Sequence, residues 1–324
     1  ICHKKGKKGT YVLKSFTQKA ISAHLKHGDG YPGDPYPGLD GSVFGADCSP
    51  VVASPVPLCG YEVRTSEALN FLDGGWGWEA VQGAKIVTGG GFELTGGPAA
   101  VSAPVTPNST WAGYTFRNYE YGWVVQDSPD GNTSYGSHVF AVFSVMPSGY
   151  EIVTSPEMAF GDGGYGGWSC PEGKVVLGGG YVADAPVAVS APGTPGSAWP
   201  HYEFGADEYG WVIRDAEDDE SNTITVWTIC ADMPAGYEVL VSDPQELDDG
   251  AYGGWSCPVG KVVTGGGFEL AGGPASVSVP GTPESVWGDL TFLPGEYGWV
   301  VRDAEDGFSS PGSAVHAICT DRCP

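Results

Sequence analysis

The chain has 324 residues, with 52 glycines, 26 prolines and a formal net charge of −24 at neutral pH. Eleven Trp, 16 Tyr and 12 Phe supply enough apolar surface for a folded core, so the composition excludes a disordered chain. The acidic balance disfavours a nucleic-acid partner, and no apolar run is long enough for a membrane-spanning helix, so we expect neither partner.

Residues 1–58 form a basic leader. Its first 28 residues contain seven Lys and no Asp or Glu, which leaves 8 basic and 39 acidic residues in the rest of the chain, a balance of −31. The stretch 15–27, "SFTQKAISAHLKH", has the pattern of one short helix. The segment 10–16, "TYVLKSF", is rich in β-forming residues and is a candidate to add to the sheet edge of a neighbouring molecule.

The leader holds a candidate metal site. A helix over residues 15–27 would put His24 and His27 on one face, and a disulfide between Cys2 and Cys48 would bring His3 near them, with Asp29 close by. Imidazole nitrogens with a carboxylate suit zinc or copper. The alternative is a polar, disulfide-stapled module whose histidines make ordinary hydrogen bonds.

The rest of the chain repeats itself three times, over residues 59–148, 149–235 and 236–324. Pro104, Pro192 and Pro280 recur every 88 residues, each inside a "VSxPxTP" segment. Short runs of β-branched and aromatic residues alternate with Gly, Pro and Asp turns, which predicts an all-β fold of three antiparallel repeats after a leader with one helix. The run "KVVTGGGFEL", which starts at Lys261, predicts a bulge, a bend or close backbone approach rather than a phosphate loop.

Eight cysteines and two sequons, at Asn108 and Asn132, indicate an oxidising, extracellular setting in which both asparagines are candidate glycosylation sites. The second and third repeats each carry two cysteines at equivalent positions, where the first has Val81 and Phe143. We therefore expect Cys170–Cys230 and Cys257–Cys319, each joining two strands of one repeat. If the repeats surround an axis, Cys323 meets Cys59 and closes the ring, which leaves Cys2–Cys48 for the leader.

The segments Trp168–Gly173 and Trp255–Gly260, within "GGYGGWSCPEGKVVLGGG" and its counterpart, resemble the vitelline membrane outer layer protein family. That resemblance implies a three-sided β-prism with pseudo-threefold symmetry and an extracellular structural or carbohydrate-related role. The repeats also resemble "CPxGKVVLGGG" repeats of secreted bacterial proteins. The leader resembles a secreted bacterial module, "CHK" followed by "AHLxHGD" and a closing Cys, which implies no activity.

The repeated aromatic residues admit two interpretations. They are most simply core residues, but an exposed platform for sugars would recur in the same way. The candidates for that platform are Tyr121, Trp123, Tyr209, Trp211, Tyr297 and Trp299.

Two further groups of residues offer side chains that could carry chemistry. The acidic loops 215–221 and 303–306 offer oxygen ligands that suit calcium, although solvated turns explain them as well. His138, His201 and His316 stand at non-equivalent positions of the repeats and form no catalytic constellation, so we expect no enzyme.

The charge split favours a secreted structural protein that assembles with itself, as a filament or surface-layer subunit. The basic leader of one molecule would lie on the acidic body of the next, although it could equally fold back on its own body. The alternative function is a lectin-like carbohydrate-binding module with repeated aromatic sites.

Overall fold

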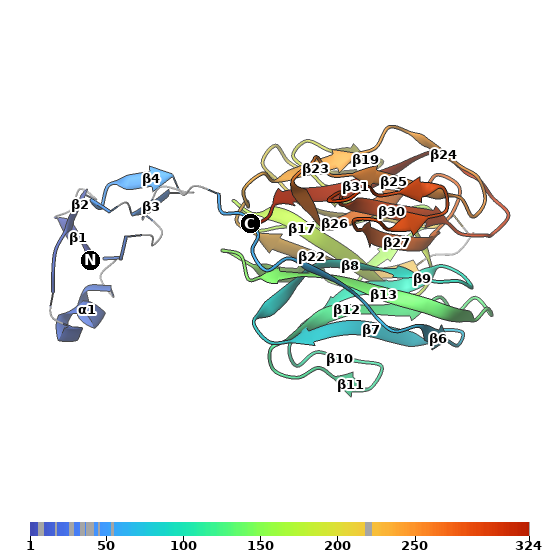
Figure 1. Cartoon of the computed structure of the whole chain (residues 1–324), viewed down its shortest axis with the longest axis horizontal. Coiled ribbons are helices and arrows are strands. Elements are labelled where there is room, and N and C mark those ends of the chain that lie inside the picture. The colour runs from blue at the N-terminus through green and yellow to red at the C-terminus, as the bar shows by residue number, and fades with distance from the viewer. Residues whose placement is uncertain are drawn as a thin grey trace. The chain divides into compact units, whose positions relative to one another are not determined.

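The computed structural model describes residues 1–5, 10–16, 18–25, 29–32, 36, 42–44, 46–52, 55–217 and 222–323. The chain divides into two compact units, Ile1–Pro55 and Val56–Pro324. The fold is all-β with one short helix, as the sequence predicts (Figure 1). Among the described residues, none of the helical structure has the length and apolar character needed to cross a membrane.

The leader unit is small and stapled by the Cys2–Cys48 disulfide. Its elements are β1 (Cys2–Lys5), β2 (Thr10–Leu13), α1 (Gln18–Leu25), β3 (Ser42–Phe44) and β4 (Pro50–Val52). β1 pairs with β2, and β3 pairs with β4, both antiparallel. The predicted strand at 10–16 therefore forms over its first four residues and has β1 as its partner.

The second unit consists of three seven-stranded antiparallel sheets, and each sheet takes strands from two repeats. Sheet one contains β7 (Trp76–Gln82), β9 (Ala99–Val105), β12 (Glu120–Asp127), β14 (Glu151–Thr154), β15 (Met158–Phe160), β17 (Val175–Ala183) and β22 (Asn222–Ala231). Sheet two contains β5 (Glu62–Thr65), β6 (Leu69–Phe71), β8 (Lys85–Glu93), β13 (Ser134–Val145), β25 (Tyr252–Ser256), β27 (Ala275–Gly281) and β30 (Gly298–Asp303). Sheet three contains β16 (Tyr165–Ser169), β18 (Val187–Gly193), β21 (Gly210–Asp215), β23 (Glu238–Val241), β24 (Gln245–Leu247), β26 (Lys261–Glu269) and β31 (Ser310–Asp321).

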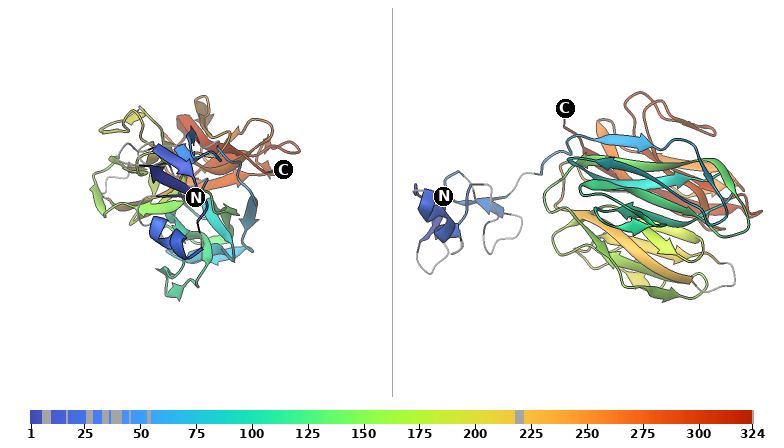
Figure 2. Two further views of the ribbon diagram at one scale, coloured as in Figure 1. Left: turned by 90° about the vertical axis from the view of Figure 1, so that its left-hand side faces the viewer. Right: turned by 90° about the horizontal axis from the view of Figure 1, so that it is seen from below.

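This sharing of strands makes the arrangement cyclic. The first repeat pairs with the second in sheet one, the second with the third in sheet three, and the third with the first in sheet two. In Figure 1 the cyan and green strands β8 and β13 accordingly lie beside the orange-brown β27, far away in sequence. Figure 2 shows the same strands from two further directions. One hydrophobic core draws side chains from all three repeats.

Each sheet also carries a short hairpin on its surface. The three hairpins are β10 (Thr110–Trp111) with β11 (Tyr114–Thr115), β19 (Ala198–Trp199) with β20 (Tyr202–Glu203), and β28 (Val286–Trp287) with β29 (Leu290–Thr291). Under each hairpin lies a small apolar cluster that is separate from the central core.

The glycine run of each repeat lies at the seam between repeats, where the backbones of two neighbouring repeats approach closely. A Cβ on Gly91 would lie 1.7 Å from the carbonyl oxygen of Ser278 in the third repeat, so only glycine lets the two backbones approach. A Cβ on Gly90 would lie 2.4 Å from the ring of Trp123, which covers it. The register of β8 with β13 also shifts between Val142 and Phe143. The run is thus a bulge and a close backbone approach together, as expected.

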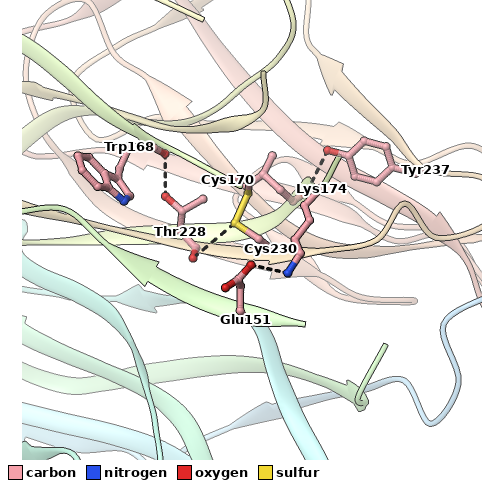
Figure 3. The surroundings of a disulfide bond; sticks show 8 residues. Glu151, Trp168, Cys170, Lys174, Thr228, Cys230 and Tyr237 are labelled. Atoms are coloured by element: carbon pink, nitrogen blue, oxygen red, sulfur yellow. Dashed lines mark hydrogen bonds and ion pairs between the residues drawn. A yellow bond between two sulfur atoms is a disulfide. The ribbon is translucent and has the colours of Figure 1, made fainter. Parts of the chain in front are cut away.

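The disulfides join the pairs expected from the sequence, but two of them connect different sheets. Cys170 follows β16 of sheet three, while Cys230 lies on β22 of sheet one (Figure 3). Around that bond, Thr228 donates to the carbonyl of Trp168 at 3.0 Å, and Lys174 pairs with Glu151. Cys257–Cys319 likewise connects sheet two to sheet three.

The fourth disulfide, Cys59–Cys323, lies where the two ends of the second unit meet. Leu58 N–H donates to the carbonyl of Asp321, and Cys323 N–H donates back to the carbonyl of Leu58, both at 2.9 Å. Residues 56–58, assigned to the leader from the sequence, therefore belong to the second unit. The ring is closed both by this covalent bond and by the strands of sheet two.

Candidate functional site

The predicted aromatic platform is wrong for its three tryptophans. Trp123, Trp211 and Trp299 are each only 1% exposed. Each indole N–H donates to a serine hydroxyl of the same repeat at 2.9 to 3.0 Å, namely Ser102, Ser190 and Ser278. These side chains cover the glycine runs from within the core, because a flat ring fills the space that the missing Cβ atoms leave, and they present no face to a ligand.

The three tyrosines of the predicted platform are half-buried and pack against the core. Each makes an edge-to-face contact with another tyrosine, with ring centroids 5.3 to 6.3 Å apart. The pairs are Tyr121–Tyr150, Tyr209–Tyr237 and Tyr297–Tyr61. These tyrosines recur because each one packs against a tyrosine of a neighbouring repeat.

A different aromatic feature is open to ligands. A hollow of about 480 Å³ lies on sheet three and is lined by residues of the hairpin β19–β20 and of the strands β23, β26 and β31. Its size falls within the range of small-molecule sites. Half-buried Trp199 and Tyr165 line it together with Glu269 and His316. Prolines, Thr194, Ser197, Ala198 and two valines of β23 complete the lining.

A hydrogen-bonded Glu–His pair lies in one wall of the hollow. Nε2 of His316 lies 2.8 Å from Oε1 of Glu269, and the His316 side chain is 4% exposed while that of Glu269 is 33% exposed. Nδ1 of His316 is buried and has no hydrogen-bond partner among the described residues. The carboxylate is thus the accessible member of the pair, and the buried imidazole holds it in position through the hydrogen bond.

The environment of Glu269 keeps it ionised. Burial raises the pKa of Glu269, but the hydrogen bond and charge of His316, the indole N–H of Trp199 and the charge of Arg214 outweigh it, so the pKa is lowered overall. At the equivalent position of sheet two, burial dominates and raises the pKa of Glu93. Only in sheet three, therefore, do the surroundings favour a carboxylate acceptor at this position.

The other two sheets have an apolar ring where sheet three has His316. In sheet one, Trp111 of the hairpin packs with Trp227, with centroids 5.9 Å apart, and Val182 stands where sheet three has Glu269. In sheet two, Trp287 packs with Phe140 at the same distance. Sheet one thus adopts the same arrangement with an apolar pair at these positions, so the fold does not depend on a Glu–His pair there.

The leader brings together three of its four predicted metal-binding residues. His3, His24 and Asp29 each offer a ligand atom, and these atoms lie within 4.8 Å of one another. His27 lies outside the described residues. Burial raises the pKa of Asp29, but hydrogen bonds from the Lys4 backbone N–H and from both histidines lower it by more, so that the pKa lies below its ordinary value.

The remaining predicted sites are simple to place. Asp303 and Asp306 lie near Asp249, while residues 218–221 of the other acidic loop lie outside the described residues. Among the described residues, the leader cluster is the group of three potential ligands whose atoms lie close enough to share an ion. Calcium binding at the acidic loops therefore stays a prediction. The sequon residues Asn108 and Asn132 are both exposed.

The hollow was not predicted from the sequence, although the sequence contains a signal for it. His316 is a departure from the repeat, since the first and second repeats have Phe140 and Trp227 at its position. A search for recurring residues passes over such departures. Comparison with known proteins adds no further guide, because no family model matches the chain and no characterised protein is significantly similar to it.

Proposed function

We propose that the protein is a secreted, extracellular carbohydrate-binding protein whose site is the hollow on sheet three. The observation that carries the proposal is the hydrogen-bonded Glu269–His316 pair beside half-buried Trp199, because His316 stands where the other two sheets have the apolar rings of Trp227 and Phe140. The four disulfide bonds are typical of extracellular proteins and support the setting.

The lining suits a neutral sugar. An aromatic ring such as Trp199 offers a flat apolar face against which the C–H groups of a sugar can pack, and the Glu269 carboxylate has acceptor capacity left for hydroxyl groups. Valines and prolines provide the apolar remainder that small-molecule sites usually have.

The same lining disfavours hydrolysis. Glycoside hydrolysis ordinarily needs two carboxyl groups across the bond, and Glu269 is the one carboxylate among the residues of the hollow. The Ser197 hydroxyl donates to the carbonyl of Thr194 at 2.7 Å, so it is engaged within its own turn. We therefore propose binding without catalysis.

The test is a glycan array followed by calorimetry on the saccharides that bind. Trp199→Ala should weaken binding about fivefold, because an aromatic contact contributes roughly 1 kcal/mol. Trp111→Ala is the matched control, since it removes the equivalent side chain of sheet one. Absence of any binding saccharide, or an equal loss in both variants, would refute the proposal.

A second candidate function is self-assembly, and a separate observation favours it. The seven Lys of residues 1–28 face no acidic residue within that segment, while the rest of the chain carries a balance of −31. Contact between the leader of one copy and the body of another would be head-to-tail, which builds filaments when it does not close.

Assembly of this kind has a direct test. Electron microscopy and sedimentation velocity at low salt should show polymers that dissolve at high salt, where surface charges are screened. A chain that lacks residues 1–55 should stay monomeric, whereas polymers of that truncated chain would exclude the leader as the contact. A full-length protein that stays monomeric at low salt would refute assembly through the leader.

A further inference from the structure

The leader contains a compact cluster of metal-ligating side chains that the carbohydrate site does not use. Nδ1 of His3 and Nδ1 of His24 lie 2.8 and 2.9 Å from the same oxygen, Oδ2 of Asp29. The other carboxylate oxygen, Oδ1, accepts the backbone N–H of Lys4 at 2.8 Å. Both imidazole nitrogens therefore converge on one fixed oxygen atom.

The local fold holds these three residues in place. Cys2 and Gly30 exchange backbone hydrogen bonds, so that His3 and Asp29, their chain neighbours, lie side by side. The Cys2–Cys48 disulfide anchors the same strand. His24 comes from the last turn of α1, and the ring of Phe16 packs against it, with centroids 3.9 Å apart.

We propose that His3, His24 and Asp29 form a binding site for a divalent transition-metal ion of the zinc and copper class. Two imidazole nitrogens and a carboxylate oxygen are the donor set that these ions accept, and three protein ligands leave a position open for water or another ligand. The proposal concerns the leader alone and goes beyond the carbohydrate-binding function.

To accept the ion, the imidazole nitrogens must move away from the carboxylate oxygen. Ligands at about 2.1 Å from a tetrahedral ion stand roughly 3.4 Å apart, so the nitrogen-to-oxygen separations of 2.8 and 2.9 Å widen by about 0.5 Å. The histidine side chains are 28% and 26% exposed, which gives the ion access, while the Asp29 side chain is 3% exposed. The site is thus open on its imidazole side.

The competing explanation is a purely structural network in which Asp29 only holds the two rings. Full-length protein stripped with a chelator should distinguish the two by titration with Zn²⁺, Cu²⁺ and Co²⁺. We expect saturable binding of one equivalent, with Cu²⁺ bound more tightly than Zn²⁺. We also expect the visible absorption of Co²⁺ to be that of a low-coordinate site with nitrogen ligands.

Variants locate the site. Asp29→Asn and His24→Asn keep groups that form hydrogen bonds but remove a preferred ligand, and each should weaken binding at least about tenfold. His138→Asn, which alters a histidine of the second unit, is the control and should bind as the wild type does. Mapping of the Cys2–Cys48 disulfide by mass spectrometry checks that the leader of each variant is folded.

The outcomes decide the proposal. Absence of saturable binding by the wild type, or unchanged binding by both leader variants, would overturn it. If the variants fail to form the disulfide, the ring resonances of the wild-type protein decide instead. Zn²⁺ should shift the NMR signals of His3 and His24 and leave those of His138 unchanged, and the opposite pattern contradicts the assignment.

Discussion

The first repeat provides a template for replacing a disulfide of the second. Cys170 and Cys230 are 60 residues apart, and in the chain-entropy account such a bond contributes about 4 kcal/mol. Val81 and Phe143 occupy the equivalent positions, and both pack in the central core. We therefore compare Cys170→Ser/Cys230→Ser with Cys170→Val/Cys230→Phe.

The two double variants should differ in stability. Both lose the cross-link, but the serine pair also buries hydroxyl groups at positions that are 7% and 0% exposed, at a cost of about 1–3 kcal/mol for each unpaired group. The Val/Phe pair instead adds apolar contact, and burying the larger ring contributes about 1.5–3 kcal/mol less any cost of overpacking. We expect the Val/Phe variant to be more stable than the serine variant by at least about 2 kcal/mol.

The assay is urea unfolding followed by tryptophan fluorescence, with linear extrapolation. The reciprocal variant, Val81→Cys/Phe143→Cys, is the control, because it should form a fifth disulfide that mass spectrometry detects. Equal destabilisation by the two replacements, together with no fifth disulfide, would refute the claim that these positions of the first and second repeats are structurally equivalent.

Three further predictions follow from local features of the body. Burial raises the pKa of Asp127 and of Asp303 to about 6 despite a hydrogen bond from a serine hydroxyl. Because the pKa of each carboxyl in the unfolded chain is near 3.8, the native state binds a proton that the unfolded state has already lost. The free energy of unfolding should therefore fall by up to about 3 kcal/mol per group as pH rises from about 4 to about 6. Asp127→Asn/Asp303→Asn should flatten that dependence in thermal denaturation, and an unchanged slope would contradict it. Gly91→Ala should lower the melting temperature strongly, because the new Cβ would meet the backbone of the third repeat. Gly161→Ala is the control and should change the melting temperature little, because there is open space at that site. An equally small effect of Gly91→Ala would show that the contact between the first and third repeats tolerates a side chain. Because the pKa of Glu269 is lowered, saccharide binding measured by calorimetry should persist at pH 4.5, and loss between pH 6 and 5 would place another group in control.

Much of the architecture could be predicted by comparing equivalent positions of the three repeats. Equivalent cysteines in two repeats and apolar residues in the third indicate which cysteines pair, and the structure contains those pairs. The short helix also lies within the expected segment 15–27, as α1. In each case the signal is local or compares like with like.

The exchange of strands between repeats could not be predicted in the same way. Periodicity shows that three units are alike, but it does not say whether β9 pairs within its own repeat or with β17 of the next. That choice depends on long-range backbone pairing, which the glycine runs permit by letting neighbouring backbones approach. A glycine run therefore indicates a seam without identifying the partner.

The candidate sites show the same division. His3, His24 and Asp29 could be grouped from the sequence because a disulfide and a helix bring them together over a short span. Trp211 and Trp199 recur equally well in the sequence, yet one is buried in the core and the other lines the hollow. Recurrence cannot separate these roles, because burial depends on which sheet face a hairpin covers.

The measurement that tests the central claim most directly replaces the polar pair of the hollow by its counterpart from sheet one. Glu269→Val/His316→Trp copies Val182 and Trp227, which already pack stably under the equivalent hairpin. Our account predicts a variant with the circular dichroism spectrum and melting behaviour of the wild type and no saccharide binding by calorimetry. Wild-type affinity in a folded variant would show that the sugar binds elsewhere and would contradict the account.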